Sequence, residues 1–432
     1  MYHTSLKQKE MRFIVFVCSF LLSFESVSFA QSVQLPIVFV HGMLASGDTY
    51  AGQITRFEMT GYDHRLLHTF DWNSLGFGRG GAVDDMDKFV DSILKVSGRE
   101  KLYLVGHSAG SGLVYNFCKD SVRSRKIAGV VLIGGFKQEK PAGHNNDLPT
   151  LNIYSEGDLV ARNAGDIPGA TNLRLISEDH YEVATGMNAF KAMHRFILGS
   201  EPSALILNAA SEKVVVSGKA VELGSNDPIA NGSVQIYKVN SGDGQRISEA
   251  PDFDFTVNNM GHWGPAALEA TSHYEFVVKG PDTSDTPIHY FREQISSVNR
   301  NVYLRSIPNS GLLSMMFSGL PSDSFPALAV FSSTKAILNG RDTLIVDGTQ
   351  LTNTDFFKPS RTTIAMFLYD GNTRGKSDLT GVGLFNMQGV FLAGIDMFVE
   401  ATKSPLKLQL NDRTLNVRRI PSKMGIVVPV FD

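Results

Sequence analysis

A serine lies at the centre of the pentapeptide Gly106-His107-Ser108-Ala109-Gly110, between an apolar run and a helix-like stretch. Residues 102–105 predict a strand and residues 111–120 predict a helix. A serine at such a sharp strand-to-helix turn needs small residues two positions before and after it, because the strained backbone packs closely on its neighbours. The spacing therefore indicates Ser108 as a nucleophile, with Gly106 and Gly110 as the small residues of its turn.

A serine nucleophile needs a base and an acid, and two later strand ends offer them. Asp158 follows a strand predicted over residues 150–155, and His180 follows one predicted over residues 173–176. Serine is a poor nucleophile until a base takes its proton, and a carboxylate holds that base in one tautomer and stabilises its cation. The ends of parallel strands meet at one edge of a sheet. We therefore expect His180 to be the base and Asp158 the acid.

Other residues of the same types stay open as alternatives. Ser111 is the nearest other serine, but it lies within the predicted helix. Asp179 adjoins His180 too closely in the sequence to orient it easily. The remaining alternatives are His144 and His194 for the base, and Asp166 and Glu156 for the acid.

A second motif follows the apolar strand predicted over residues 35–40, where the chain reads His41-Gly42-Met43. Gly42 allows a tight turn at the strand end. The amide of Met43 and the amide of Ala109 are then predicted to face the negative oxygen that develops when an acyl group is attacked. The alternative interpretation of His41-Gly42 is an ordinary turn that ends a strand.

With these motifs, residues 35–199 resemble a small α/β-hydrolase of the bacterial lipase/esterase kind. The matching segments are His41-Gly42-Met43, residues 106–110, residues 156–160 and Asp179-His180. The domain order resembles archaeal-type lipases that carry a β-rich C-terminal lipid-binding region. The resemblance implies a minimal α/β-hydrolase fold of about six mostly parallel strands, followed by all-β C-terminal domains: a β-sandwich and a second β domain.

From the motifs and the resemblance together we expect a secreted serine ester hydrolase, a lipase or carboxylesterase. It would cleave acyl esters through an acyl-enzyme, and it would need no cofactor. Three alternatives share the same three catalytic residues: a polyester depolymerase, a thioesterase and an acyltransferase. A binding or adhesion protein is the alternative from another class, in which the β domains would be the functional part.

The N-terminus is typical of a secretory signal peptide over residues 1–30. Basic residues precede an apolar run over residues 13–24, and Ser28-Phe29-Ala30 supplies small residues at the cleavage positions. The run is shorter than the roughly 20 residues of a membrane span, although an uncleaved anchor is the alternative. We expect cleavage near Ala30 and a secreted or periplasmic protein.

Charge and cysteine content give no indication of a nucleic-acid partner, a metal site or a disulfide. The net charge is −3, and no basic patch indicates a nucleic-acid partner. No cluster of His, Cys and Asp has metal-ligand spacing, so no metal is expected. Cys18 falls in the signal peptide, which leaves Cys118 alone and predicts no internal disulfide.

The pattern of the chain predicts three domains after the signal peptide. Residues 31–200 alternate strand and helix and form the catalytic domain. From residue 203 the helical periodicity disappears, and short alternating runs predict a β-sandwich over residues 203–306. That segment resembles a carboxypeptidase-regulatory or transthyretin-like sandwich.

Residues 309–432 predict a second β domain, rich in Phe and Met. These side chains fill an ordinary core in one interpretation. In the other they form an adaptable apolar surface. Between the strands around Ser108 and Asp158, residues 136–149 are too short for a helical cap, so the catalytic core has no lid of its own. We therefore expect this C-terminal region to have a lid or lipid-binding role, to contact a lipid surface and to shape acyl-chain specificity.

Overall fold

The computed structural model of the chain describes residues 33–76, 81–203, 213–282, 284–295, 300–308, 311–353, 357, 362–386 and 391–432. Gln34–Asp432 form one unit. The predicted signal peptide lies outside the described residues. Within the described part of the chain, no helix has the length and apolar character needed to cross a membrane.

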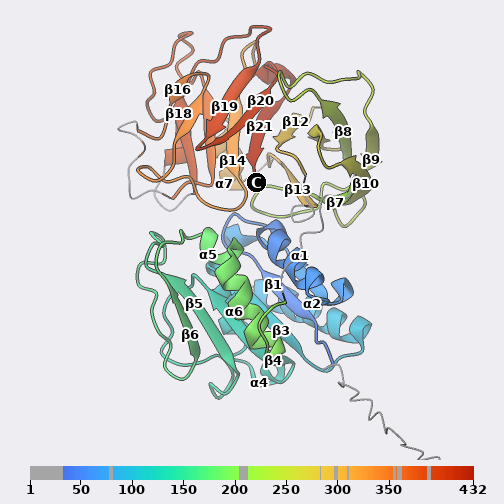
Figure 1. The fold of residues 1–432 in the computed structure, drawn as a ribbon, viewed down its shortest axis with the longest axis vertical. Helices are drawn as coiled ribbons and strands as arrows, with labels where there is room; N and C mark the ends of the chain where they lie inside the picture. Colours follow the sequence, from blue (N-terminus) through green and yellow to red (C-terminus); the bar gives the residue numbers. More distant parts are fainter. Residues whose placement is uncertain are drawn as a thin grey trace, which may run out of the picture. The chain divides into compact units, whose positions relative to one another are not determined.

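Short runs of buried aliphatic residues form a parallel sheet in the order β2-β1-β3-β4-β5-β6 (Figure 1). The central strands read as continuous apolar runs because helices cover both faces of the sheet. All six predicted strands are present, which confirms the minimal fold. They are β1 Ile37–Val40, β2 Leu67–Phe70, β3 Leu102–His107, β4 Ile127–Ile133, β5 Thr150–Ser155 and β6 Thr171–Leu175.

Two helical layers bury the faces of this sheet. On one face Phe57 of α1 (Ala51–Met59) and Phe190 of α6 (Met187–Leu198) pack with β1, and α5 (Glu182–Thr185) joins them. On the other face Met86 of α2 (Ala82–Ser97) and Val114 of α3 (Ala109–Phe117) pack against the same strands. The short α4 (Ser121–Arg125) leads into β4. Our sequence analysis did not predict α1, because Gly52 and the buried polar Gln53 and Thr55 interrupt its apolar period.

Period-two alternation dominates the rest of the chain, which forms three further sheets. Three strands form the sheet β10-β7-β13, eight form β18-β17-β14-β21-β12-β11-β8-β9, and four form β16-β15-β19-β20. The strand bounds are β7 Lys213–Glu222, β8 Ser233–Val239, β9 Phe253–Thr256, β10 His262–Glu269, β11 His273–Lys279, β12 Ile288–Arg292, β13 Asn301–Ser306, β14 Leu328–Ser332, β15 Leu344–Val346, β16 Thr349–Gln350, β17 Ala365–Tyr369, β18 Leu392–Asp396, β19 Leu406–Leu410, β20 Arg413–Val417 and β21 Ile426–Phe431. Helix α7 (Gly311–Phe317) lies between β13 and β14.

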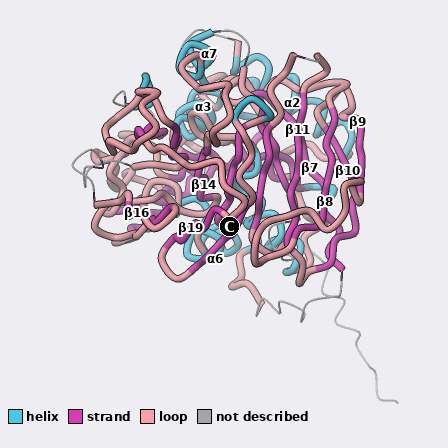
Figure 2. The backbone as a smooth tube through the Cα atoms, turned by 90° about the horizontal axis from the view of Figure 1, so that it is seen from above, coloured by secondary structure: helices cyan, strands magenta, loops and turns pink. Residues whose placement is uncertain are grey.

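The eight-stranded sheet has a core on each face. Trp263 of β10 packs with Phe276 of β11 on the side of the three-stranded sheet, and Figure 2 shows strands of both sheets in the same part of the molecule. Leu328 of β14 packs with Leu408 of β19 on the side of the four-stranded sheet. The fold class expected from sequence, an α/β-hydrolase followed by β-rich sheets, is confirmed.

The division of the β region differs from the sequence-based expectation in one respect. The predicted domains 203–306 and 309–432 both contribute strands to the eight-stranded sheet, where β12 pairs in parallel with β21. Alternation of apolar residues locates strands, but it carries no information about which strands pair. The predicted boundary therefore does not separate two sheets.

Candidate active site

The turn between β3 and α3 holds Ser108 in a left-handed backbone conformation, with φ 53° and ψ −121°. A Cβ on Gly106 would lie 2.5 Å from the carbonyl oxygen of Gly110, and a Cβ on Gly110 would lie 2.3 Å from that of Val40. Both contacts are too short for any side chain. The glycines of the pentapeptide are therefore required by close backbone packing, which holds the strained serine at the end of β3.

Ser108, His180 and Asp158 form a continuous hydrogen-bonded chain. Ser108 Oγ lies 2.8 Å from His180 Nε2, and His180 Nδ1 lies 2.7 Å from Asp158 Oδ2. Each of the three follows its own strand, and they stand at the same edge of the sheet. The arrangement allows His180 to take the Ser108 proton while Asp158 fixes the imidazole with Nδ1 protonated.

The carboxylate of Asp158 is 2% exposed and is held from several sides. Its Oδ1 accepts hydrogen bonds from the amides of Val160 at 2.8 Å and Ala161 at 2.9 Å. Burial acts to raise the pKa of Asp158, but the hydrogen bond from His180 and these two amides outweigh it and lower the pKa. Asp158 therefore stays ionised beside the imidazole.

His107, the second residue of the pentapeptide, holds the backbone of His180 through a side-chain hydrogen bond. The Nε2–H of His107 donates to the carbonyl of His180 at 2.7 Å, and the two rings lie 4.9 Å apart. Complete burial lowers the pKa of His107 to about 3, and the proximity of His180 adds to the shift. His107 is therefore neutral and adds no positive charge beside an imidazolium at His180.

The turn after β1 lies directly against the serine. A Cβ on Gly42 would lie 3.0 Å from Ser108 Cβ, so the backbone of this turn reaches the serine only because the residue is glycine. Within the described part of the chain, the amides of Met43 and Ala109 donate to no protein group. These are two free amides in the two turns that meet at Ser108, and free backbone amides are the groups that bind an oxyanion.

The alternatives to these residues occupy other places. Ser111 is buried in α3 and donates to the carbonyls of Gly106 and Ile133. Asp179 accepts from the amides of Tyr181 and Glu182 at the start of α5. The other candidates are also engaged elsewhere: Asp166 accepts from Tyr154, Glu156 pairs with Arg174, His144 contacts the Lys119 carbonyl and His194 stacks on Phe57.

Comparison with known proteins agrees with the two-part architecture. Residues 36–222 match the alpha/beta hydrolase fold family, and residues 212–307 match the lipase C-terminal domain family. The first half of the chain has the α/β-hydrolase fold. We call residues 34–203 the hydrolase domain and residues 213–432 the β region, which begins with the segment that matches the lipase C-terminal domain family. The transthyretin-like resemblance of the same segment stays a prediction.

Several solved structures of hydrolases match about two fifths of the chain. One is a CIB-like hydrolase from Thermoplasma acidophilum, which is 15% identical over 40% of this chain and 90% of that chain, with a TM-score of 0.31. Another is a monoacylglycerol lipase from Paleococcus ferrophilus, which is 17% identical over 38% of this chain and 96% of that chain, with a TM-score of 0.29.

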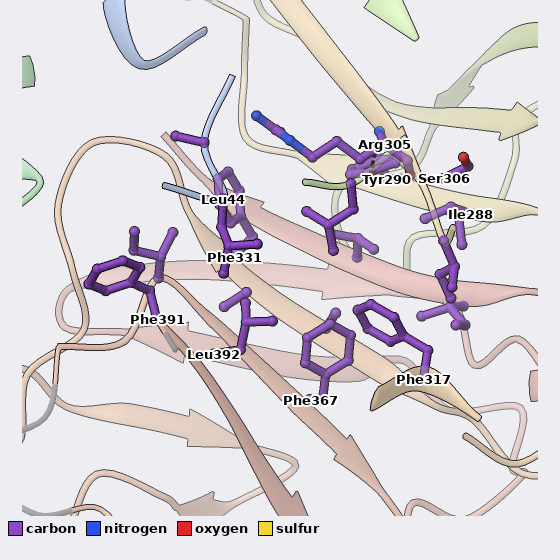
Figure 3. Close-up of a pocket in the computed structure, with 18 of the residues that line it drawn as sticks. Leu44, Ile288, Tyr290, Arg305, Ser306, Phe317, Phe331, Phe367, Phe391 and Leu392 are labelled. Carbon is purple, nitrogen blue, oxygen red and sulfur yellow. Dashed lines mark hydrogen bonds between the residues drawn. The ribbon is translucent and has the colours of Figure 1, made fainter. Parts of the chain in front are cut away.

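An apolar cavity of about 110 Å³ lies between the hydrolase domain and the β region (Figure 3). A single water needs roughly 10–15 Å³ of such space, so the cavity has room for several heavy atoms. Met43 and Tyr181 line it from the hydrolase domain, and Phe391, which stacks on the His180 ring at 5.8 Å, lines it from the β region. One lining residue, Phe391, therefore joins the cavity wall to the candidate base.

One face of the eight-stranded sheet forms most of the cavity wall. The lining residues alternate along four of its strands, as expected for side chains that share a face, and a fifth strand contributes one residue. Arg305 is the charged residue of the lining, and its guanidinium pairs with Asp48 at 2.6 Å. The lining residues of this face are Ile288 and Tyr290 on β12, Ala329 and Phe331 on β14, Ala365 and Phe367 on β17, Leu392 on β18, and Ile426 and Val428 on β21.

The polar residues through which the β region contacts the catalytic loops were not predicted from the sequence. Arg341 Nη1 and the amide of Ala336 both donate to Asp179 Oδ2, next to His180. Asn226 enters the turn after β1. An Asn in a loop is a recognisable signal for a turn. The neighbouring residues along the chain, however, do not indicate which residue of the hydrolase domain Asn226 contacts.

Among the described residues, no group of three or more His, Cys, Asp or Glu side chains is arranged to hold a metal ion. Cys118 is a free thiol in the core at the end of α3, where burial raises its pKa to about 12. It packs there as a small apolar group.

Proposed function

We propose that this protein is a serine ester hydrolase. The observation that carries the proposal is the hydrogen-bonded chain from Ser108 through His180 to Asp158 at a strained strand-to-helix turn. Ser108 Oγ attacks the ester carbonyl carbon while His180 Nε2 takes the hydroxyl proton. The Met43 and Ala109 amides stabilise the resulting oxyanion.

The tetrahedral adduct then collapses, and the bond to the alcohol breaks. His180 delivers its proton to the departing alkoxide, which leaves an acyl group on Ser108. A water molecule gives a proton to His180, attacks the acyl carbon and releases the carboxylic acid. Ser108 recovers its proton from His180, so the cycle closes without a cofactor.

The adjoining cavity supports lipid esters as the substrate class. Its walls are aliphatic and aromatic, and it starts at Met43 and Phe391, beside the reacting groups. An acyl chain that enters it gains roughly 0.8 kcal/mol for each methylene removed from water. The long acyl chain of a lipid therefore suits this site better than acetate does.

Contact with a lipid surface through the β region is also part of the proposal. Phe325 and Met424 are exposed and lie on adjoining segments, because the Ser422 amide donates to the Phe325 carbonyl at 2.8 Å. Secretion or export to the periplasm, after cleavage near Ala30, rests on the N-terminal sequence alone.

Hydrolysis of p-nitrophenyl esters from acetate to palmitate tests the proposal, with Ser108→Ala as the matched inactive variant. We expect Ser108-dependent hydrolysis that favours longer chains. Parallel assays with acyl thioesters, a polyester film and an alcohol acceptor separate the thioesterase, depolymerase and acyltransferase alternatives. A folded protein without Ser108-dependent turnover on any of these substrates would contradict the proposal.

A further inference from the structure

An asparagine of the β region is inserted into the turn that carries the Met43 amide. Asn226 lies in the loop between β7 and β8 and is 7% exposed. Its Nδ2 lies 3.2 Å from His41 Nε2, 3.0 Å from the Ala45 carbonyl and 3.1 Å from the Trp72 carbonyl. The hydroxyl of Ser46 donates to its Oδ1 at 2.5 Å. Because the Ala45 and Trp72 carbonyl oxygens can only accept hydrogen bonds, the amide nitrogen of Asn226, and not its oxygen, must face them.

The hydrogen-bond donors around His41 determine which of its two ring nitrogens carries the proton. His41 Nε2 faces two donors, Asn226 Nδ2 and the amide of Trp72 at 3.1 Å, so it carries a lone pair. The proton therefore lies on Nδ1, which donates to the Gly42 carbonyl at 2.8 Å. Complete burial lowers the pKa of His41, which keeps the ring neutral with this single N–H.

The Gly42 carbonyl and the Met43 amide belong to one peptide unit. Because a peptide unit is planar and trans, fixing its C=O also fixes the direction of its N–H. The Nδ1–H of His41 therefore aims the Met43 amide, and Asn226 of the β region acts together with the Trp72 amide to hold the His41 tautomer that makes this possible. Complete burial of His41 leaves it no contact with substrate.

We propose that Asn226 is a positioning residue for the oxyanion site, acting through His41 and the Gly42–Met43 peptide. The inference rests on the proposed function. It gives the lipase C-terminal domain a part in the chemical step, separate from the binding of acyl chains. Removing Asn226 takes away one of the two donors at His41 Nε2 and the side-chain donor to the Ala45 carbonyl, so the ring that directs the Gly42–Met43 peptide is held less firmly.

The test replaces Asn226 with Gly. The backbone φ of Asn226 is +62°, which suits Gly, so this change removes the side chain without backbone strain. Asn231→Gly is the matched control, because Asn231 has the same φ of +62° in the same domain but is exposed. Asn226→Asp is a second variant, since a carboxylate keeps the acceptor for Ser46 but cannot donate to His41.

Rates are measured on p-nitrophenyl butyrate and divided by the concentration of active sites titrated with a phosphonate ester. Loss of one oxyanion donor lowers kcat by roughly 10²–10³-fold, so misdirection of one donor is expected to lower it by about 10–100-fold. We expect that loss in Asn226→Gly and Asn226→Asp, with KM nearly unchanged and a boronic acid bound more weakly by the same factor. Asn231→Gly should keep the wild-type rate.

A wild-type rate per titrated site in Asn226→Gly would overturn the inference, even if fewer sites were active, because that result describes a merely structural anchor. A fully active Asn226→Asp would also overturn it. Neither result touches the proposed function, which fails only if the wild-type protein lacks Ser108-dependent hydrolysis.

Discussion

Replacing Ile288 with Phe should shorten the acyl chain that the protein accepts. Ile288 on β12 is 3% exposed, lines the cavity and pairs with Ile426 on β21. Figure 3 shows it at the opposite end of the cavity from Phe391, which stacks on His180. A phenyl ring at this position fills the distal part of the cavity and leaves the end beside His180 unchanged.

The size of the effect follows from the burial of methylenes. Each methylene transferred from water to an apolar site contributes about 0.8 kcal/mol, which is roughly a fourfold change in kcat/KM. If the ring excludes three methylenes, the variant should lose on the order of 60-fold on the longest esters relative to the wild-type protein. Esters too short to reach Ile288 should be hydrolysed at the wild-type rate.

The assay compares kcat/KM for p-nitrophenyl esters from acetate to palmitate in both proteins, with thermal unfolding as a check on the fold. The ratio of kcat/KM between the variant and the wild-type protein on the acetate and butyrate esters serves as the internal control. A folded Ile288→Phe protein with the wild-type chain-length profile would refute the assignment of the cavity to the acyl chain.

Three further predictions test the site and the fold. Asp158→Asn should lower kcat on the order of 10⁴-fold and add nothing to Ser108→Ala; near-normal activity of this variant would contradict the acid assignment. Gly110→Ala should destabilise the protein by about 1–3 kcal/mol in urea unfolding, because its Cβ would lie 2.3 Å from the Val40 carbonyl oxygen; an unchanged midpoint would contradict the packing argument. Buried Glu275 accepts from His289, Arg246 and Arg418, and these hydrogen bonds outweigh the opposing effect of burial and lower its pKa to about 2. Because this folded-state pKa lies below the unfolded value, Glu275 contributes about 3 kcal/mol above pH 5 that is lost as the pH falls toward 2. Urea unfolding at pH 6 and pH 3 should therefore differ less in Glu275→Gln than in the wild-type protein, and an equal difference would contradict the assignment.

The sequence predicted the strands of the hydrolase domain because their signals are local. Gly106 and Gly110 must be small for steric reasons, and the apolar run before Ser108 is continuous because both faces of its strand are buried. The order of the three candidate residues along the chain then predicted a common sheet edge. Their hydrogen-bonded contact at 2.7 and 2.8 Å agrees with that expectation, while their catalytic roles stay a prediction.

The contacts between the hydrolase domain and the β region could not be predicted in the same way. Asn226 and Arg341 are polar residues in loops, and nothing in their neighbours along the chain indicates that His41 or Asp179 is the partner. The pairing of β12 with β21 joins segments more than 130 residues apart. Sequence alternation identifies both strands, yet the pairing depends on tertiary packing. For the Phe residues of the C-terminal region, the sequence allowed two interpretations, an ordinary core or an apolar binding surface, and it did not favour one for the residues that line the cavity.

Labelling of the nucleophile by a diethyl p-nitrophenyl phosphate ester tests the central claim most directly. We predict release of one p-nitrophenol per active site, loss of ester hydrolysis and a phosphoryl group on the peptide that contains Ser108. We also predict no labelling of Ser108→Ala and slow labelling of His180→Ala. A folded Ser108→Ala protein that hydrolyses esters, or a phosphoryl group on a different residue of the active wild-type protein, would contradict the central claim.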